Sequence, residues 1–190
     1  MGGTRGIASS ILLPAERSVV RANQFEIRWI PPETGSVIEI GIRTKSGRVL
    51  WQAAKVPSVT GSLDSADVRE KLEHYQGSGA QEPLIIFLRD SENNESTVEF
   101  SLLSTRADDE LRQELAKWDV EGDSLVRYIG RASVFNRRRM LVEATKEYDA
   151  ALALAPQSRD LLESAISAHH QIGDYVVERE LIRRLPLENQ

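Results

Sequence analysis

The sequence predicts two domains, an antiparallel β-sandwich followed by a set of antiparallel helical hairpins. Up to about Ser104 apolar residues alternate with polar ones, which is the period of a strand with one buried face. After Ser104 the apolar residues recur every three or four positions, which is the period of an amphipathic helix. Each part of the 190-residue chain is long enough to bury a small core.

The first part contains several short strand patterns. Apolar Phe25, Ile27 and Trp29 alternate with Glu26 and Arg28, so one face of this segment is expected to be buried. Four further strands are predicted, separated by turn sequences at 31–35, 46–47 and 90–94: Val37–Ile42, Val49–Trp51, Leu84–Leu88 and Thr97–Leu103.

One helix interrupts these strands between residues 64 and 75. Its apolar side is formed by Val68, Leu72 and Tyr75, and Asp64 or Ser65 can cap its first turn. Two tryptophans of this part, at positions 29 and 51, are interpreted as core anchors, because an aromatic side chain contributes most when a large area is buried.

The second part begins with acidic residues at 108–110, which suit the first turn of a helix. Leu111, Leu115 and Trp118 then form the apolar stripe of that helix. Four more helices are predicted after it: Ser124–Asn136, Leu141–Ala155, Arg159–Gln171 and Asp174–Arg184.

Small and aromatic residues alternate through two of these helices: Tyr128, Ala132, Phe135, Ala144, Tyr148, Ala151 and Pro156. Their spacing resembles the tetratricopeptide repeat, a two-helix unit. In such a unit Ala132 and Ala144 are close-approach points between helices, Phe135 and Tyr148 fill the space beside them, and Pro156 ends the second helix. The segment 173–185, which opens on Gly-Asp-Tyr, resembles the second half of another repeat, and the likeness covers about residues 125–186.

The strand-rich part is similar in its order of strands and turns to fibronectin type III or immunoglobulin-like domains. The predicted organisation is therefore a flexible lead at 1–9, an immunoglobulin-like β-sandwich with an inserted helix at 10–104, and tetratricopeptide-like helical hairpins at 105–190. The glycine-rich opening reads like the start of a domain excised from a longer parent protein.

The composition limits the kinds of partner and site that the sequence supports. Residues 1–104 carry 11 basic and 13 acidic residues, and residues 105–190 carry 13 and 16, so neither part predicts a nucleic-acid partner. The absence of cysteine excludes disulfides and thiolate metal sites. No apolar run approaches the roughly 20 residues that cross a bilayer, so no direct membrane insertion is predicted for this sequence. The combination of modules is typical of bacterial envelope proteins and favours an extracytoplasmic, membrane-tethered location.

The tetratricopeptide resemblance implies a binding face on the first helix of each hairpin. That face comprises Val126, Ile129, Ser133, Asn136 and Arg137 from one helix, and Asp160, Glu163, Ser167 and His170 from the next. It lacks the lysine and asparagine pattern that holds a C-terminal carboxylate in some family members, so this ligand is not implied. An uncommitted solvated surface is the alternative interpretation.

Other polar groups have plain structural interpretations. The arginines at 137–139 can hold a phosphate or an acidic peptide, but they also suit the C-terminal charge of a helix. His169 and His170 are adjacent, so they point to different faces and are expected to be partly exposed and structural. Ser164 is poorly spaced from both histidines for a catalytic pair, and no catalytic, metal or cofactor motif is present.

The sequence favours a non-catalytic protein-interaction or scaffold module that binds a partner peptide or helix on its helical groove. A structural spacer or a homo-oligomer is the first alternative, in which the last hairpin, around Val176, Val177, Leu181 and Ile182, forms the contact. A regulatory or recruiting subunit of an enzyme encoded elsewhere is the second alternative.

Overall fold

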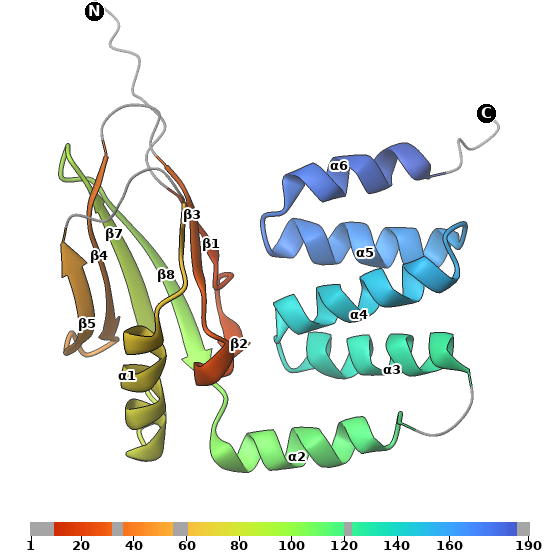
Figure 1. Cartoon of the computed structure of the whole chain (residues 1–190), viewed down its shortest axis with the longest axis horizontal. Coiled ribbons are helices and arrows are strands. Elements are labelled where there is room, and N and C mark those ends of the chain that lie inside the picture. Colours follow the sequence, from red (N-terminus) through yellow and green to blue (C-terminus); the bar gives the residue numbers. More distant parts are fainter. Residues whose placement is uncertain (1–9, 32–35, 55–60, 120–122, 186–190) are drawn as a thin grey trace, which may run out of the picture. The chain divides into compact units, whose positions relative to one another are not determined.

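The computed structural model describes residues 10–31, 36–54, 61–119 and 123–185. The chain divides into two compact units, residues 1–104 and 105–190. The first unit is built mainly of strands and the second of helices, so the layout is β followed by α (Figure 1). The predicted lead at 1–9 lies outside the described residues, as does most of the turn predicted at 31–35.

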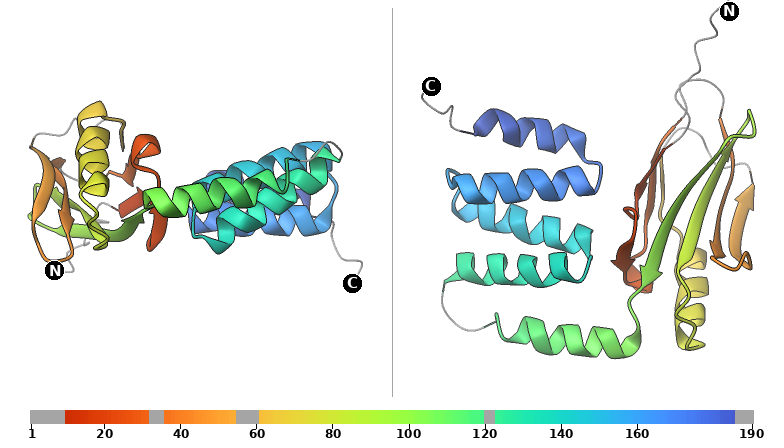
Figure 2. Two further views of the ribbon diagram at one scale, coloured as in Figure 1. Left: turned by 90° about the horizontal axis from the view of Figure 1, so that it is seen from below. Right: turned by 180° about the vertical axis from the view of Figure 1, so that it is seen from behind.

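The described part of the first unit contains eight strands in two sheets (Figures 1 and 2). The smaller sheet has the order β1 (Ser10–Leu13), β3 (Ile27–Ile30) and β6 (Ser62–Leu63). The larger sheet has the order β2 (Ser18–Val20), β8 (Glu95–Leu102), β7 (Leu84–Asp90), β4 (Val37–Thr44) and β5 (Val49–Ala54). The strands predicted within β3, β4, β5, β7 and β8 are thus all present.

Both sheets contribute to one hydrophobic core. Ile27 and Trp29 of β3 are buried there together with Ile42 of β4 and Phe100 of β8. Helix α1 (Ala66–Gly77), the predicted inserted helix, adds its three apolar residues to the same core. A short 3-10 helix, η1 (Ala22–Gln24), packs beside α1. Because both sheets and α1 share this core, they fold as one layered unit.

The two tryptophans differ in burial. Trp29 is buried within the core, as predicted for an anchor. Trp51 is only partly buried and packs against the edge of the core, where its indole Nε1–H donates a hydrogen bond of 2.7 Å to Asp67 of α1. The β4–β5 hairpin turns at Gly47, whose φ of 97° suits a residue without a Cβ.

The prediction of a wholly antiparallel sandwich is wrong at one edge of the larger sheet. Strand β2 pairs with β8 in parallel, so this sheet is mixed. The backbone N–H of Arg17 also bonds to the carbonyl of Glu99, which brings the chain to the β8 edge. Strands β1, β2 and β6 were not predicted, because runs of two to four residues are too short to show an alternating pattern.

The described part of the second unit contains five α-helices, and all five were predicted. They are α2 (Thr105–Ala116), α3 (Ser124–Arg137), α4 (Leu141–Leu154), α5 (Arg159–Gln171) and α6 (Tyr175–Arg184). From α3 onward consecutive helices run in opposite directions, so α3 and α5 run in the same direction (Figures 1 and 2). Asp174 caps α6 by accepting a hydrogen bond from the backbone N–H of Val177.

The helices pack through the small residues that the sequence singled out. Ala132 of α3 and Ala144 of α4 are buried, and α3 and α4 are in extensive contact. Phe135 is buried as well, while Tyr148 is half-buried against a core that includes Leu162 and Leu181. Helix α4 ends at Leu154, two residues before Pro156, which cannot donate the next helical hydrogen bond.

Candidate binding face on the helical unit

All nine residues of the predicted binding face are exposed. Those on α3 and those on α5 recur every three or four positions, so each set occupies one side of its helix. Both helices begin after an acidic or hydroxyl residue in extended conformation, at Asp123 and Ser158, which fixes where each exposed stripe begins.

A hollow of about 450 Å³ lies between α3, α4 and α5. It is lined by Asn136, Tyr148, Asp160, Glu163, Ser164, Ser167, Ala168 and Gln171. Four of these, Asn136, Asp160, Glu163 and Ser167, belong to the predicted face. The lining residues include two carboxylates and neither lysine nor arginine, so the hollow is polar and acidic.

Three side chains of the hollow have no hydrogen-bond or ion-pair partner among the described residues: the Asn136 amide, the Tyr148 hydroxyl and the Asp160 carboxylate. Burial raises the pKa of the Tyr148 hydroxyl, so it is a protonated donor at neutral pH. The other carboxylate, Glu163, accepts a hydrogen bond of 2.8 Å from Arg159. The hollow therefore presents one unbalanced carboxylate and two groups able to form hydrogen bonds with a ligand.

The sequence interpretation missed part of this lining. Tyr148 was assigned to packing alone, although its aromatic ring packs and its hydroxyl remains uncommitted. Ser164 and Gln171 each lie one residue beyond a predicted face residue on α5, and a wider stripe on that helix would have included both. The Ser164 hydroxyl donates a hydrogen bond of 2.7 Å to the Asp160 carbonyl and is not directed at a histidine.

Two other predicted residues, Ser133 and Arg137, line a second hollow of about 380 Å³ between α2 and α3. Arg137 and Arg138 both donate hydrogen bonds to the Glu114 carboxylate of α2. Burial by itself would raise the pKa of Glu114, but the hydrogen bond from Arg138 and the positive charge of Arg137 outweigh it, so the pKa lies below its ordinary value. These two arginines therefore hold α2 against α3 in this structure.

The remaining predicted residues line neither of these hollows. Val126 and Ile129 are 53% and 38% exposed on α3. His170 is exposed and its Nδ1 lies 3.1 Å from a carboxylate oxygen of Glu178 on α6. Along α3 the predicted face is therefore apolar at the beginning of the helix, at Val126 and Ile129, and polar toward its end.

The two adjacent histidines do point to different sides of α5. The expectation that both are partly exposed is wrong for His169, which is buried with its Nε2 3.0 Å from Asp149 and its Nδ1 3.3 Å from Asp174. The side chain joins α4, α5 and the start of α6, and this contact explains its burial. Within the described part of the chain, no group of three or more acidic or histidine side chains is placed to bind a metal ion.

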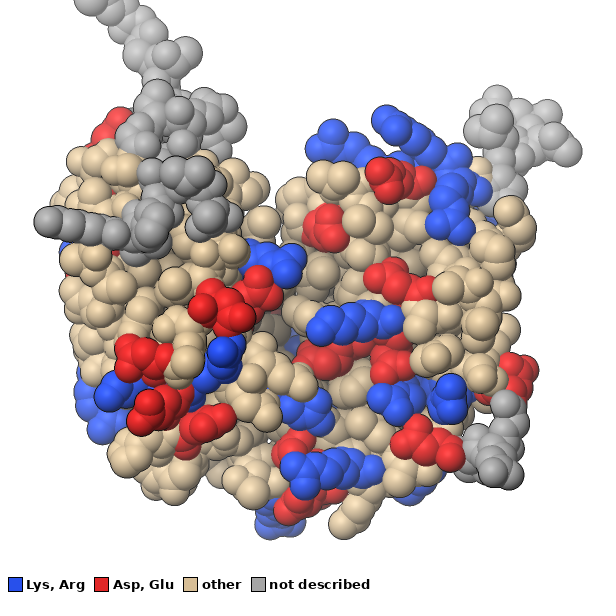
Figure 3. All heavy atoms as spheres, in the orientation of Figure 1, with Lys and Arg blue, Asp and Glu red and all other residues tan. Residues whose placement is uncertain are grey.

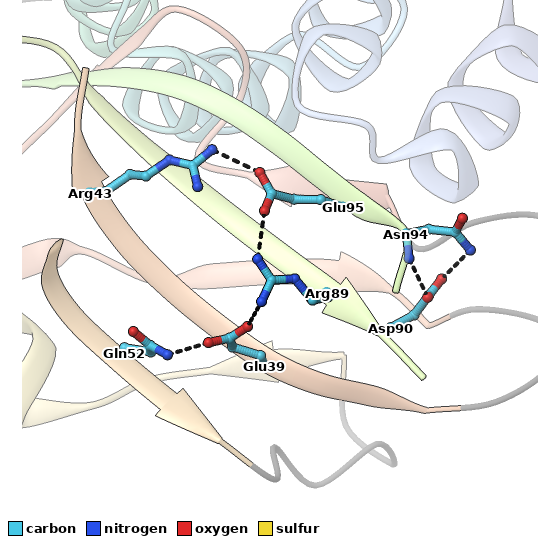
Figure 4. Close-up of polar contacts among 7 residues, drawn as sticks. All are labelled: Glu39, Arg43, Gln52, Arg89, Asp90, Asn94 and Glu95. Carbon is cyan, nitrogen blue, oxygen red and sulfur yellow. Dashed lines mark hydrogen bonds and ion pairs between the residues drawn. The ribbon is translucent and has the colours of Figure 1, made fainter. Parts of the chain in front are cut away.

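The β unit carries its own polar cluster on the larger sheet (Figure 4). Arg89 bridges Glu39 and Glu95 at 2.5 and 3.1 Å, and Arg43 bonds to Glu95 at 2.7 Å. The hydrogen bond from Arg43 is the main cause that holds the pKa of Glu95 below its ordinary value, and Arg89 adds to it against the effect of burial. Arg89 on β7 pairs with acids on both adjacent strands, and Arg43 on β4 reaches Glu95 on β8 across β7, so each charge in the cluster has an opposite partner and none is uncommitted.

On the face drawn in Figure 3, basic and acidic side chains are interspersed over both units. Comparison with known proteins adds no family: no protein-family model matches the sequence, and no curated protein matches it. Within the described residues, none of the helices has the length and apolar composition needed to cross a bilayer.

Proposed function

We propose that this protein is a non-catalytic interaction protein whose helical unit binds a segment of a partner protein on the exposed face of α3 and α5. The observation that carries the proposal is the 450 Å³ hollow between these helices, which is lined by four of the exposed residues of that face and by polar groups without a partner among the described residues. Polar groups that a hollow leaves uncommitted are available to a ligand.

Two features support a tetratricopeptide-like helical unit. Antiparallel helices pack through Ala132 and Ala144, and the side chains that face away from this contact on α3 and α5 form the proposed binding face. An immunoglobulin-like sandwich is the corresponding proposal for the β unit, supported by two sheets that share one core. In this proposal the β unit anchors the helical unit in a larger assembly.

The test is a selection of random eight-residue peptides displayed on phage, with the full chain immobilised. Enriched peptides are then labelled with fluorescein and titrated in solution by fluorescence anisotropy. Ser167→Arg fills the hollow and Ile129→Asp changes the neighbouring part of the face. Ile182→Asp is the matched control, because Ile182 is similarly exposed, at 46% against 38% for Ile129, but lies on α6.

We expect the two changes on the face to weaken peptide binding by at least about tenfold, equivalent to about 1.4 kcal/mol, and the α6 change to leave it intact. Circular dichroism establishes that all variants keep their helical content. Enriched peptides that bind the three variants equally well, or a selection that enriches no peptide, would contradict the proposal.

Self-association is the second candidate function, and a specific observation favours it. Of the residues predicted for this contact on α6, Val176 and Ile182 are 69% and 46% exposed, whereas Leu181 is buried in the core of the helical unit. Tyr175 of the same helix is 44% exposed. Tyr175 and Ile182 are seven residues apart and lie on one side of α6, and an exposed apolar side of this kind is a surface on which a second copy can pack. Sedimentation velocity distinguishes the two candidates, because Ile182→Asp would then convert an oligomer into a monomer.

A further inference from the structure

We infer that the segment bound in the α3–α5 hollow is an extended basic peptide that places a lysine or arginine side chain against Asp160. This inference rests on the proposed function and adds to it the chemistry of the occupant. It follows from three properties of the hollow: the sign of its charge, the donors and acceptors along it, and its length.

The charge of the hollow comes from α5. Asp160 and Glu163 are the charged lining residues, and neither lysine nor arginine is among the eight residues of the lining. Glu163 is already paired with Arg159, whereas Asp160 has no ion-pair partner among the described residues. The nearest arginine of the predicted face, Arg137, is engaged by Glu114. A cationic side chain would complete the pairing of Asp160, and a carboxylate in the same place would be repelled.

The hydrogen-bonding groups suit a peptide main chain. An extended peptide carries N–H and C=O groups that are not paired within the peptide itself, and each loses water when it binds. The Asn136 amide both donates and accepts, and the protonated Tyr148 hydroxyl can do the same. These two side chains come from α3 and α4, whereas both carboxylates come from α5, so a peptide that lies along the hollow can meet main-chain partners and a negative charge.

The length of the hollow gives the size of the segment. Asp160 and Gln171, which both line it, are 11 residues apart on α5 and therefore about 16 Å apart along the helix axis at 1.5 Å per residue. An extended peptide rises about 3.3 Å per residue, so about five residues fill this length. The expected ligand is thus a segment of about five residues with one lysine or arginine at a fixed position.

The experiment uses the enriched eight-residue peptides and the full chain. We expect a lysine or arginine to recur at one position, and its replacement by glutamine to weaken binding about five- to tenfold, the size of a charge-assisted hydrogen bond at a partly solvated site. Asp160→Asn should weaken the basic peptide by the same factor and should leave the glutamine peptide unchanged, because both changes remove one interaction. Asp109→Asn is the matched control, since Asp109 is also an exposed aspartate near the start of a helix.

Two results overturn the inference and are distinguishable. Peptides that depend on Ser167 and Ile129 but contain no recurring basic residue, or bind Asp160→Asn with unchanged affinity, refute the basic ligand and leave the proposed function standing. Peptides whose affinity is insensitive to Ser167→Arg and Ile129→Asp refute the binding face itself, and the inference falls with it.

Discussion

The contact between Trp118 and Gly130 allows two opposing effects of one substitution to be weighed. Gly130 lies in the middle of α3, and a Cβ built on it would fall on the indole atoms Cδ2, Cε3 and Cζ3 of Trp118. Alanine favours a helix interior over glycine by about 1 kcal/mol. Gly130→Ala therefore gains helix propensity and displaces the indole ring that packs on this position.

The displacement is expected to outweigh the gain. Trp118 is 37% exposed, so about two thirds of its surface, on the order of 150 Å², is buried against neighbours such as α3. At about 25 cal/mol per Å², the loss of only about 40 Å² of this contact cancels the gain of about 1 kcal/mol. The added carbon would lie less than 3.0 Å from three atoms of the Trp118 indole, so the ring must move away from α3 and loses more than this buried area. We therefore expect Gly130→Ala to destabilise the helical unit by about 1–2 kcal/mol.

The assay is urea unfolding, followed by circular dichroism at 222 nm and by tryptophan fluorescence. Gly77→Ala in α1 is the control, because nothing lies within 4 Å of a Cβ built at that glycine and its backbone needs no positive φ. It should be neutral or stabilising by up to about 1 kcal/mol. The difference between the wild-type and Trp118→Phe spectra gives the emission of Trp118. This emission should shift to longer wavelength in Gly130→Ala. A Gly130→Ala protein stabilised as much as Gly77→Ala, with unchanged emission, would refute the reasoning.

Two further predictions concern carboxylates that accept several hydrogen bonds, the partly buried Glu114 and the buried Asp90. Glu114→Gln should cost about 1 kcal/mol, mainly through the better-buried bond from Arg138, and should raise amide hydrogen exchange in α2. Since the pKa of Glu114 lies below its ordinary value of 4.5, this contribution is present above pH 4.5 and is lost as the pH falls further, so wild type and variant should converge in acid. Asp90→Ala should destabilise the β unit by about 2–3 kcal/mol in urea unfolding, because the buried Asp90 accepts three hydrogen bonds, two of them from Asn94. Burial alone would raise the pKa of Asp90, but the hydrogen bonds outweigh it, so this pKa lies below its ordinary value of 3.8. The difference in stability between wild type and Asp90→Ala should therefore shrink below that pH. The control is Asp64→Ala, at an exposed aspartate, which should change stability by less than about 0.5 kcal/mol.

The helices could be predicted because each repeats its apolar residues over three or more turns. Leu111 and Leu115 of α2 are buried as their spacing requires, and the small residues Ala132 and Ala144 mark where α3 and α4 meet. The long strands are redundant in a different way: β8 alternates apolar and polar residues, β7 begins with a continuous apolar run, and β4 repeats isoleucine at every second position. Strand β2 does not, because its parallel place beside β8 depends on pairing across about 80 residues of chain, which no local pattern records.

The candidate site was predictable to the extent that it depends on helix periodicity. The tetratricopeptide resemblance implied the nine residues on α3 and α5, and all nine are exposed, as their helical spacing allows. Periodicity could not show that Arg137 is engaged, because its partner Glu114 belongs to α2 and lies 23 residues away. Periodicity also could not show that the ring of Tyr148 packs in the core while its hydroxyl faces the hollow, since a spacing argument treats a side chain as either core or surface.

The two exposed surfaces of the helical unit differ in chemistry, and this difference bears on which of them holds a partner. The α3–α5 hollow is polar, so a ligand there must replace the water on Asp160 and Asn136 with equivalent hydrogen bonds. A ligand of matched charge therefore binds with higher affinity than one without it. Helix α6 exposes Val176 and Ile182, and any apolar surface of suitable shape can bury them favourably. The hollow is therefore expected to select partners by their amino-acid sequence, whereas α6 is expected to associate with apolar surfaces of many sequences. A single helical unit can use both surfaces at once, because the described residues that line the hollow come from α3, α4 and α5 and none comes from α6.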